Sequence, residues 1–185
     1  KRQLAVSETQ KFGHVTYFFN GNRSSKFADD LEDYVEITSD RVSFDERPWM
    51  KAAEITDVII DGLQSKKYDF MRINFPNGDM VGHTGDFQAT CISVEATDLC
   101  IKRLLPEIEA VGGVLIIAAD HGNADYAINA DGSPNTAHSL NPVPIILVST
   151  NQDIRVKDGI LADVAPTILA RMGLDQPDKM TGSSL

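Results

Sequence analysis

Apolar residues recur along this chain in two patterns, one typical of strands and the other typical of helices. Short runs rich in apolar, β-branched and aromatic residues predict strands at 14–19 (HVTYFF), 34–38, 68–75 (YDFMRINF), 114–119 (VLIIAA) and 144–149 (PIILVS). Apolar residues at helical spacing predict helices over 50–64, 87–111 and 161–172. Asn20-Gly21, Gly112-Gly113 and Gly173 are expected to end the elements that they follow.

The order of these elements favours an α/β fold. Strands and helices alternate, which is typical of a mostly parallel sheet flanked by helices. Residues 114–119 are all apolar, as expected for a strand covered on both faces. Residues 43–49 carry charges and Pro48 and are expected to form a loop. No linker is long enough to divide the chain, and 185 residues correspond to about one domain.

Composition narrows the classes of function. The net charge is −10 and no basic stripe offsets it, so a surface for nucleic acid or anionic lipid is disfavoured. No apolar run approaches the roughly 20 residues of a membrane span, and no signal peptide opens the chain. Cys91 and Cys100 lie nine residues apart in one predicted helix, on opposite faces, where they cannot pair. These features predict a reduced, cytoplasmic protein.

Histidines and carboxylates occur together beside the predicted strands. Asp79 and His83 are four residues apart, so a single helical turn would place both side chains on one face. Asp120 and His121 follow the apolar run 114–119, at the carboxyl end of a strand, where open α/β sheets place ligands. His138 precedes the run 144–149. Mixed Asp and His ligands suit Zn²⁺ or Mn²⁺, and five of them predict two ions bridged by a phosphate.

Each of these signals also has a purely structural interpretation. The Asp79–His83 pair could be hydrogen-bonded without a metal, Asp120 could cap the segment after it, and His138 could be an ordinary loop histidine. The metal hypothesis is preferred because all three signals fall at strand ends.

Four further residues have weaker signals. Lys11 is either a phosphate contact or a solvated surface lysine. His14, at the start of a predicted strand, is expected to be packed or hydrogen-bonded rather than a ligand. Trp49 is expected to anchor the core, and Arg72 to face outward or to reach a carboxylate.

Several nucleotide and hydrolase motifs are absent from the sequence. The chain contains no G-x-S-x-G elbow, no G-x-x-x-x-G-K-[ST] loop and no G-x-G-x-x-G opening a helix. A nucleotide-binding enzyme is therefore disfavoured.

Four motifs together resemble a known family. SETQKFGHVTYFFNG (7–21), NGDMVGHTG (77–85), AADHGNAD (118–125) and TAHSLNPVP (136–144) resemble C-terminal motifs of cofactor-independent (2,3-bisphosphoglycerate-independent) phosphoglycerate mutases. DERPWMKAAEIT (45–56) fits the same pattern. That family belongs to the alkaline phosphatase superfamily, and the resemblance covers nearly the whole chain.

The resemblance implies an activity, its cofactors and its site residues. The family interconverts 3-phosphoglycerate and 2-phosphoglycerate in glycolysis and gluconeogenesis, using a phosphoserine intermediate and two divalent ions. Mn²⁺ is the expected ion, with Mg²⁺, Co²⁺ or Zn²⁺ as alternatives. By resemblance, Asp79, His83 and His138 hold one ion, Asp120 and His121 hold the other, and Lys11 assists at the phosphoserine.

The chain lacks parts of the family's pattern. It has no D-G-x-G stretch and no serine in the family's nucleophile motif, and it starts at Lys1 rather than Met. The expectation is that residues 1–185 are the C-terminal segment of the metal-binding phosphatase domain, alkaline phosphatase-like and incomplete at its N-terminal side. The phosphotransferase domain would be absent and the isolated chain inactive. The intact enzyme is expected to be a monomer, while the exposed strand edge favours self-association of the fragment.

Two other hypotheses remain open at this stage. One is another metallohydrolase of the superfamily, such as a phosphomonoesterase or a relative of phosphopentomutase. The other is a non-enzymic module that keeps its metal site for structure or for a partner.

Overall fold

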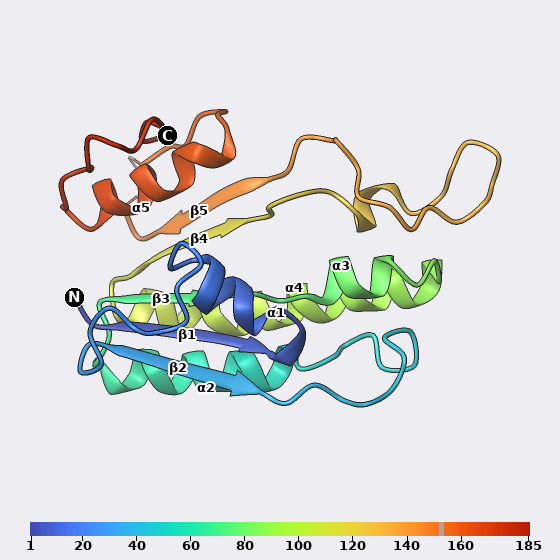
Figure 1. Ribbon diagram of the computed structural model, residues 1–185, viewed down its shortest axis with the longest axis horizontal. Helices are drawn as coiled ribbons and strands as arrows, with labels where there is room; N and C mark the ends of the chain where they lie inside the picture. Colours follow the sequence, from blue (N-terminus) through green and yellow to red (C-terminus); the bar gives the residue numbers. More distant parts are fainter. Residues whose placement is uncertain (152–153) are drawn as a thin grey trace.

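Three parallel strands form the main sheet of the computed structural model, which describes residues 1–151 and 154–185 (Figure 1). The central strand β1 (Gln3–Glu8) pairs with β2 (Glu32–Ile37) on one side and with β3 (Phe70–Ile73) on the other. Strands β4 (Val114–Ala118) and β5 (Ile145–Ser149) form a separate antiparallel pair. The α/β class with a parallel sheet is confirmed, and the strands are divided between two sheets.

Two long helices cover one face of the main sheet. Helix α2 (Ala52–Ser65) contacts both β1 and helix α4 (Phe87–Ala110) (Figure 1). The core between them is made of buried aliphatic side chains: Leu4, Val6, Ile55, Ile59, Leu63 and Leu104. Burying such side chains contributes about 2 kcal/mol each, so this layer holds the two helices against the sheet.

The predicted strand at 14–19 is wrong, because these residues continue a helix. Helix α1 (Thr9–Gly13) leads directly into a π-helical segment, η1 (His14–Phe18). The aromatic residues that suggested a strand are on the outside, with Phe18 and Phe19 both more than half exposed. Thr16 is buried, and its hydroxyl donates to the carbonyl of Phe12 within the helix. The central strand β1, which lies just before this helix, was not predicted from the sequence.

The remaining predicted elements are present with shifted ends. Helix α2, helix α4, and the C-terminal pair η3 (Leu161–Asp163) and α5 (Val164–Arg171) match the three predicted helices. Strands β2 to β5 match the other four predicted strands. Residues 43–49 form turns, as predicted.

Two burial predictions are wrong. Strand β4 is only partly buried along its length, because one of its edges and part of its surface face a cleft instead of further protein. Trp49 is 52% exposed and does not anchor the core; Met50, the next residue, is buried instead. Cys91 is exposed and Cys100 is buried on α4, and both are free as expected.

The loops that follow the strands converge at one end of the fold. Strand β1 leads to α1, strand β3 leads to the short helix α3 (Asn77–Gly82), and β4 leads into residues 119–126, which include the 3₁₀ turn η2 (Ala124–Tyr126). Carboxyl ends of strands are where α/β sheets carry their ligand sites. Among the described residues, no helix has both the length and the apolar character needed to cross a membrane.

Candidate metal centre

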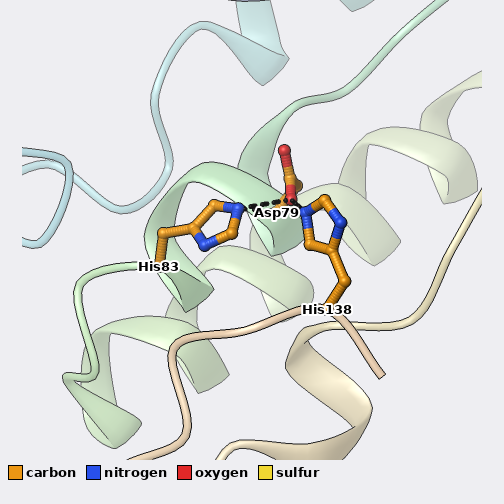
Figure 2. Close-up of side chains that lie close together, drawn as sticks. All are labelled: Asp79, His83 and His138. Carbon is orange, nitrogen blue, oxygen red and sulfur yellow. Dashed lines mark hydrogen bonds and ion pairs between the residues drawn. The ribbon is translucent and has the colours of Figure 1, made fainter. Parts of the chain in front are cut away.

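Helix α3 places Asp79 and His83 on one face, as their spacing predicts. The Nε2 atom of His83 lies 3.0 Å from Oδ1 of Asp79 (Figure 2). The helix is held at its start by Asn77, a fully buried residue whose amide donates to the carbonyl oxygens of Pro48 at 3.1 Å and Trp49 at 2.9 Å. Because its first residue is fixed to the 48–49 turn, the helix presents its Asp-His pair from a rigid support.

His138 completes a three-residue group from a segment distant in sequence. Its Nε2 atom lies 3.0 Å from Oδ1 of Asp79 and 3.1 Å from Nε2 of His83 (Figure 2). The ligand atoms of Asp79, His83 and His138 all lie within 4.8 Å of one another, the sole such group of three or more among residues 1–151 and 154–185. One carboxylate and two imidazoles converging on a point are a donor set that suits a divalent transition metal.

The tautomer of His83 is fixed by a backbone carbonyl. Its Nδ1 atom lies 2.6 Å from the carbonyl oxygen of Thr136, which can only accept a hydrogen bond. Nδ1 therefore carries the proton, and the lone pair of Nε2 points toward Asp79 and His138. A ring held in this way by its second nitrogen is the usual arrangement of a metal-binding histidine.

His121 and Asp120, predicted for a second ion, lie beside this group. The ring of His121 stacks on that of His138 with centroids 3.7 Å apart, and its Nε2 lies 3.8 Å from Oδ1 of Asp79. Asp120 is largely exposed, with Oδ1 3.7 Å from Nε2 of His121. All five predicted ligands are thus gathered in one place, but Asp120 and His121 do not form a three-donor group of their own. That they bind metal stays a prediction.

Lys11 is a partner of the site rather than a solvated surface lysine. Its Nζ lies 2.7 Å from Oδ2 of Asp79, and both side chains are only 15% exposed. Burial raises the pKa of Asp79, but the hydrogen bond and charge of Lys11, together with His83 and His121, outweigh this effect and hold the pKa below its ordinary value. Asp79 is therefore a carboxylate with one oxygen held by Lys11 and the other facing the imidazoles.

Two loops carry the histidines and are fastened to each other. Gly122 and Ser139 form a bridge in which the Ser139 amide donates to the Gly122 carbonyl at 2.9 Å. Asp125 reinforces it, because its Oδ2 accepts from the hydroxyl of Ser139 at 2.9 Å and from the amide of Asn141 at 2.7 Å. These bonds set His121 and His138 at a fixed distance.

Three residues that were not predicted from the sequence orient the histidines and Asp79: Asp125, Thr136 and Asn123. Asn123 is buried between β4 and α3, with its amide nitrogen 3.3 Å from Oδ1 of Asp79. All three lie within the quoted motifs or at their ends, but nothing in their residue type marks them as part of a metal centre.

Two other predictions are settled by the structure. His14 belongs to η1, not to a strand, and it is exposed rather than packed in the core, with its ring 5.2 Å from that of Phe18. Partial desolvation and the charge of Lys11 lower its pKa. Arg72 neither faces outward nor reaches a carboxylate by hydrogen bonding. It is 8% exposed and donates to the carbonyl of Val15 and to the side-chain oxygen of Gln3, each at 2.7 Å. Arg72 therefore ties η1 to the sheet.

The sequence of the chain matches a family of metal-dependent enzymes, as the donor set suggests. Residues 1–176 match the sequence profile of the Metalloenzyme superfamily. The chain belongs to that superfamily. Its relatives include 2,3-bisphosphoglycerate-independent phosphoglycerate mutases, which confirms the resemblance seen in the motifs. The protein from Parabacteroides distasonis is 50% identical over 186 aligned residues, and that from Trypanosoma brucei brucei is 47% identical over 192.

A solved structure shares the fold of this Metalloenzyme superfamily chain. The phosphoglycerate mutase of Leishmania mexicana, whose crystals were studied at low cobalt concentration, superposes with a TM-score of 0.91 at 42% identity. The alignment covers 98% of this chain and 36% of the Leishmania protein. The Parabacteroides alignment covers all of this chain and 36% of that relative. The chain thus spans about a third of the length of the relatives that it matches.

Proposed function

We propose that residues 1–185 are the C-terminal segment of the metal-binding phosphatase domain of a phosphoglycerate mutase that interconverts 3-phosphoglycerate and 2-phosphoglycerate. The observation that carries the proposal is the convergence of Asp79, His83 and His138 on one point with Lys11 beside them. This arrangement occurs in a Metalloenzyme superfamily chain that is about half identical to named mutases.

The donor set fits two divalent cations. Asp79, His83 and His138 would hold one, and Asp120 with His121 would supply part of the shell of the other. Mixed imidazole and carboxylate ligands suit Mn²⁺, with Co²⁺, Zn²⁺ or Mg²⁺ as alternatives. When bound, such ions supply positive charge that stabilises phosphate oxygens during transfer.

Lys11 is proposed to act on the transferred phosphoryl group. An ammonium group has three donors, and one of them is used by Asp79. The others can bind a phosphate oxygen held beside the site. In the proposed reaction a serine oxygen loses its proton and bonds to phosphorus as the bond to the glycerate oxygen breaks, and that glycerate oxygen takes up a proton. The other glycerate hydroxyl then loses its proton and bonds to phosphorus as the serine–phosphorus bond breaks and the serine oxygen is reprotonated.

The serine is proposed to come from outside residues 1–185, together with the missing ligands of the second ion and the phosphotransferase domain. A cleft of about 830 Å³ supports this division. It runs between the unpaired edge of β3 and the unpaired edge of β4, and apolar side chains such as Leu104, Ile108 and Ile168 line it. A strand from the rest of the polypeptide would join the two sheets through this cleft.

Phosphorus NMR of the complete polypeptide that contains residues 1–185 tests the function. The protein is stripped of metal, reloaded with Mn²⁺ and given 3-phosphoglycerate. A growing 2-phosphoglycerate signal supports the proposal, whereas free phosphate alone would indicate a phosphomonoesterase. An unchanged spectrum with Mn²⁺ bound would refute an enzymic role and favour a non-enzymic metal-binding module.

The 185-residue chain by itself serves as the second arm. It is expected to leave the spectrum unchanged, because none of its serines occupies the nucleophile motif. Turnover by this chain alone would disprove the claim that the nucleophile lies elsewhere.

The same resemblance leads us to propose a cytoplasmic, monomeric parent enzyme. The open β3 and β4 edges make the isolated chain prone to associate, since unpaired strand edges pair with other chains. Size-exclusion chromatography of both forms checks this: the complete polypeptide should elute as a monomer and the isolated chain as larger species. Larger species from the complete polypeptide would refute the monomer.

A further inference from the structure

Asn123 is a buried amide placed directly against the carboxylate of the candidate metal centre. It is 4% exposed, and its Nδ2 atom lies 3.3 Å from Oδ1 of Asp79 and 3.4 Å from the backbone oxygen of the same residue. These two contacts link the loop after β4 to helix α3. The reverse orientation of the amide would place its oxygen against a carboxylate, so repulsion fixes the nitrogen on the Asp79 side.

Helix α3 is shaped to receive this amide at Gly82. A methyl group on Gly82 would lie 2.2 Å from Oδ1 and 2.9 Å from Cγ of Asn123. Only a residue without a side chain allows so close an approach. Gly78, four residues earlier on the same helix, has no such constraint, because a methyl group there would meet the Cβ of Ala124 at an ordinary 3.7 Å.

The contact also leaves one polar atom of Asn123 unsatisfied. The Oδ1 atom of Asn123 is buried and has no hydrogen-bond partner among the described residues. An unsatisfied buried carbonyl oxygen disfavours the folded state, and such exceptions concentrate at functional sites.

We propose that Asn123 is a positioning residue for the metal centre, and that Gly82 leaves the space in which the amide of Asn123 lies. Oδ2 of Asp79 is fixed by Lys11, and Oδ1 faces His83 and His138. Asn123 donates a hydrogen bond to this same Oδ1 and fixes the plane of the carboxylate. Because the amide is neutral, it does not repel a bound cation as a second positively charged group would. The inference rests on the proposed metal site and adds a residue outside its direct ligands.

The first test is Co²⁺ binding to the complete polypeptide that contains residues 1–185, followed by visible absorption. Asn123→Ala should weaken Co²⁺ binding about 10- to 100-fold, the range for partners of metal ligands, and change the band positions or intensities of the bound form. Asn129→Ala is the matched control, because Asn129 makes two similar amide contacts, to Ser133 and Pro134, in the same stretch of chain. It should bind Co²⁺ as the wild type does.

The second test uses the glycines of α3. Gly82→Ala should weaken Co²⁺ binding as much as Asn123→Ala, because the added methyl displaces the amide from Asp79. Gly78→Ala should have no effect. In a protein that already carries Asn123→Ala, adding Gly82→Ala should cause no further loss of Co²⁺ affinity, because the amide that the methyl group would displace is gone. If the two substitutions acted independently, their fold-losses of affinity would multiply.

The outcomes separate this inference from the proposed function. Failure of the wild-type protein to bind Co²⁺ would overturn the metal site and the inference with it. Wild-type binding together with an unchanged affinity and spectrum for Asn123→Ala would overturn the inference alone. Multiplying effects in the double variant would also overturn it, because Gly82 would then act independently of Asn123.

Discussion

Asp79 connects every part of the candidate site. One of its oxygens accepts from Lys11, and the other faces His83, His138, His121 and the amide of Asn123. When the imidazoles are neutral, Lys11 is the only one of these contacting groups that carries a full positive charge. The charge of this partly buried carboxylate is therefore balanced mainly by Lys11 when no metal is bound.

Replacing Lys11 by Met should destabilise the metal-free protein more than the Mn²⁺-loaded protein. Removing one partner of a partly buried ion pair leaves an uncompensated charge and costs about 1–3 kcal/mol, between the values for surface and fully buried pairs. A bound cation would offset most of that loss. Urea unfolding with and without Mn²⁺ measures both values. The control is Lys51→Met, because Lys51 is about as exposed as Lys11 and its ion pairs to Asp40 and Glu54 lie outside the candidate metal centre. An equal loss in both conditions would contradict the dependence on Lys11.

Residue types at strand ends predicted which side chains would gather, but not how they are held. Asp79 and His83 could be placed from their spacing, and Asp120 and His121 from the apolar run before them. Asn123 and Asp125 could not, because asparagine and aspartate after a strand are equally common in ordinary turns. Their roles depend on contacts to α3 and to residues 139–141, which only the folded chain brings near.

The 121–141 segment works as a unit although it contains little regular structure. The Gly122–Ser139 and Ile128–Pro134 bridges are its only β-bridges among the described residues. Asp125 fixes the end nearest the histidines, and Asp131 caps a turn at the far end by accepting from Ser133. Two aspartates of similar geometry thus stabilise opposite ends of one loop.

Asp125→Ala should loosen the histidine end of this loop. Loss of its hydrogen bonds should speed hydrogen exchange at the Ser139 amide by roughly tenfold, the equivalent of about 1.4 kcal/mol. Asp131→Ala, at the other end, should leave that amide unchanged. Equal protection of Ser139 in the wild type and in Asp125→Ala would show that the backbone bridge alone holds the two loops.

One element was predicted with the wrong secondary structure. Residues 14–19 have strong strand propensity, yet they continue the helical segment that begins at Thr9. The side chains of Tyr17, Phe18 and Phe19 are exposed on its surface. Their rings contact Arg72 and each other instead of a core. Tertiary contacts overrode local propensity there, as they commonly do for aromatic residues.

At the scale of the whole molecule, the chain closes with a tail fastened to the start of its last helix. Asp163 accepts from the amides of Ile160 and Ser183 at 2.8 Å each, and the amide of Leu185 donates to the hydroxyl of Thr167 at 2.9 Å. The two backbone hydrogen bonds lower the pKa of Asp163 below its ordinary value of 3.8. The carboxylate form is therefore the one that holds the tail.

Acid should release this tail before the rest of the fold is lost. A pKa lowered on folding means that the stabilisation is present above about pH 4 and disappears as the pH falls through the folded pKa. The NMR shift of the Ser183 amide, followed from about pH 6 to pH 2.5, should move in that window. Asp163→Asn should abolish the pH dependence. A Ser183 shift that still titrates in Asp163→Asn would assign the change to another group.

The candidate centre draws its side chains from two parts of the molecule that share little contact elsewhere. Lys11, Asp79 and His83 belong to the body built on β1–β3, whereas His121 and His138 belong to the part that contains β4, β5 and α5 (Figure 1). Outside the site, these parts meet mainly where α4 touches β4 and where η2 touches α3 and α4. An ion bound at the junction would therefore act as a crosslink, since it stabilises only the state in which both parts are in place. With the ion the two parts should unfold cooperatively; without it, the C-terminal part should open first and independently.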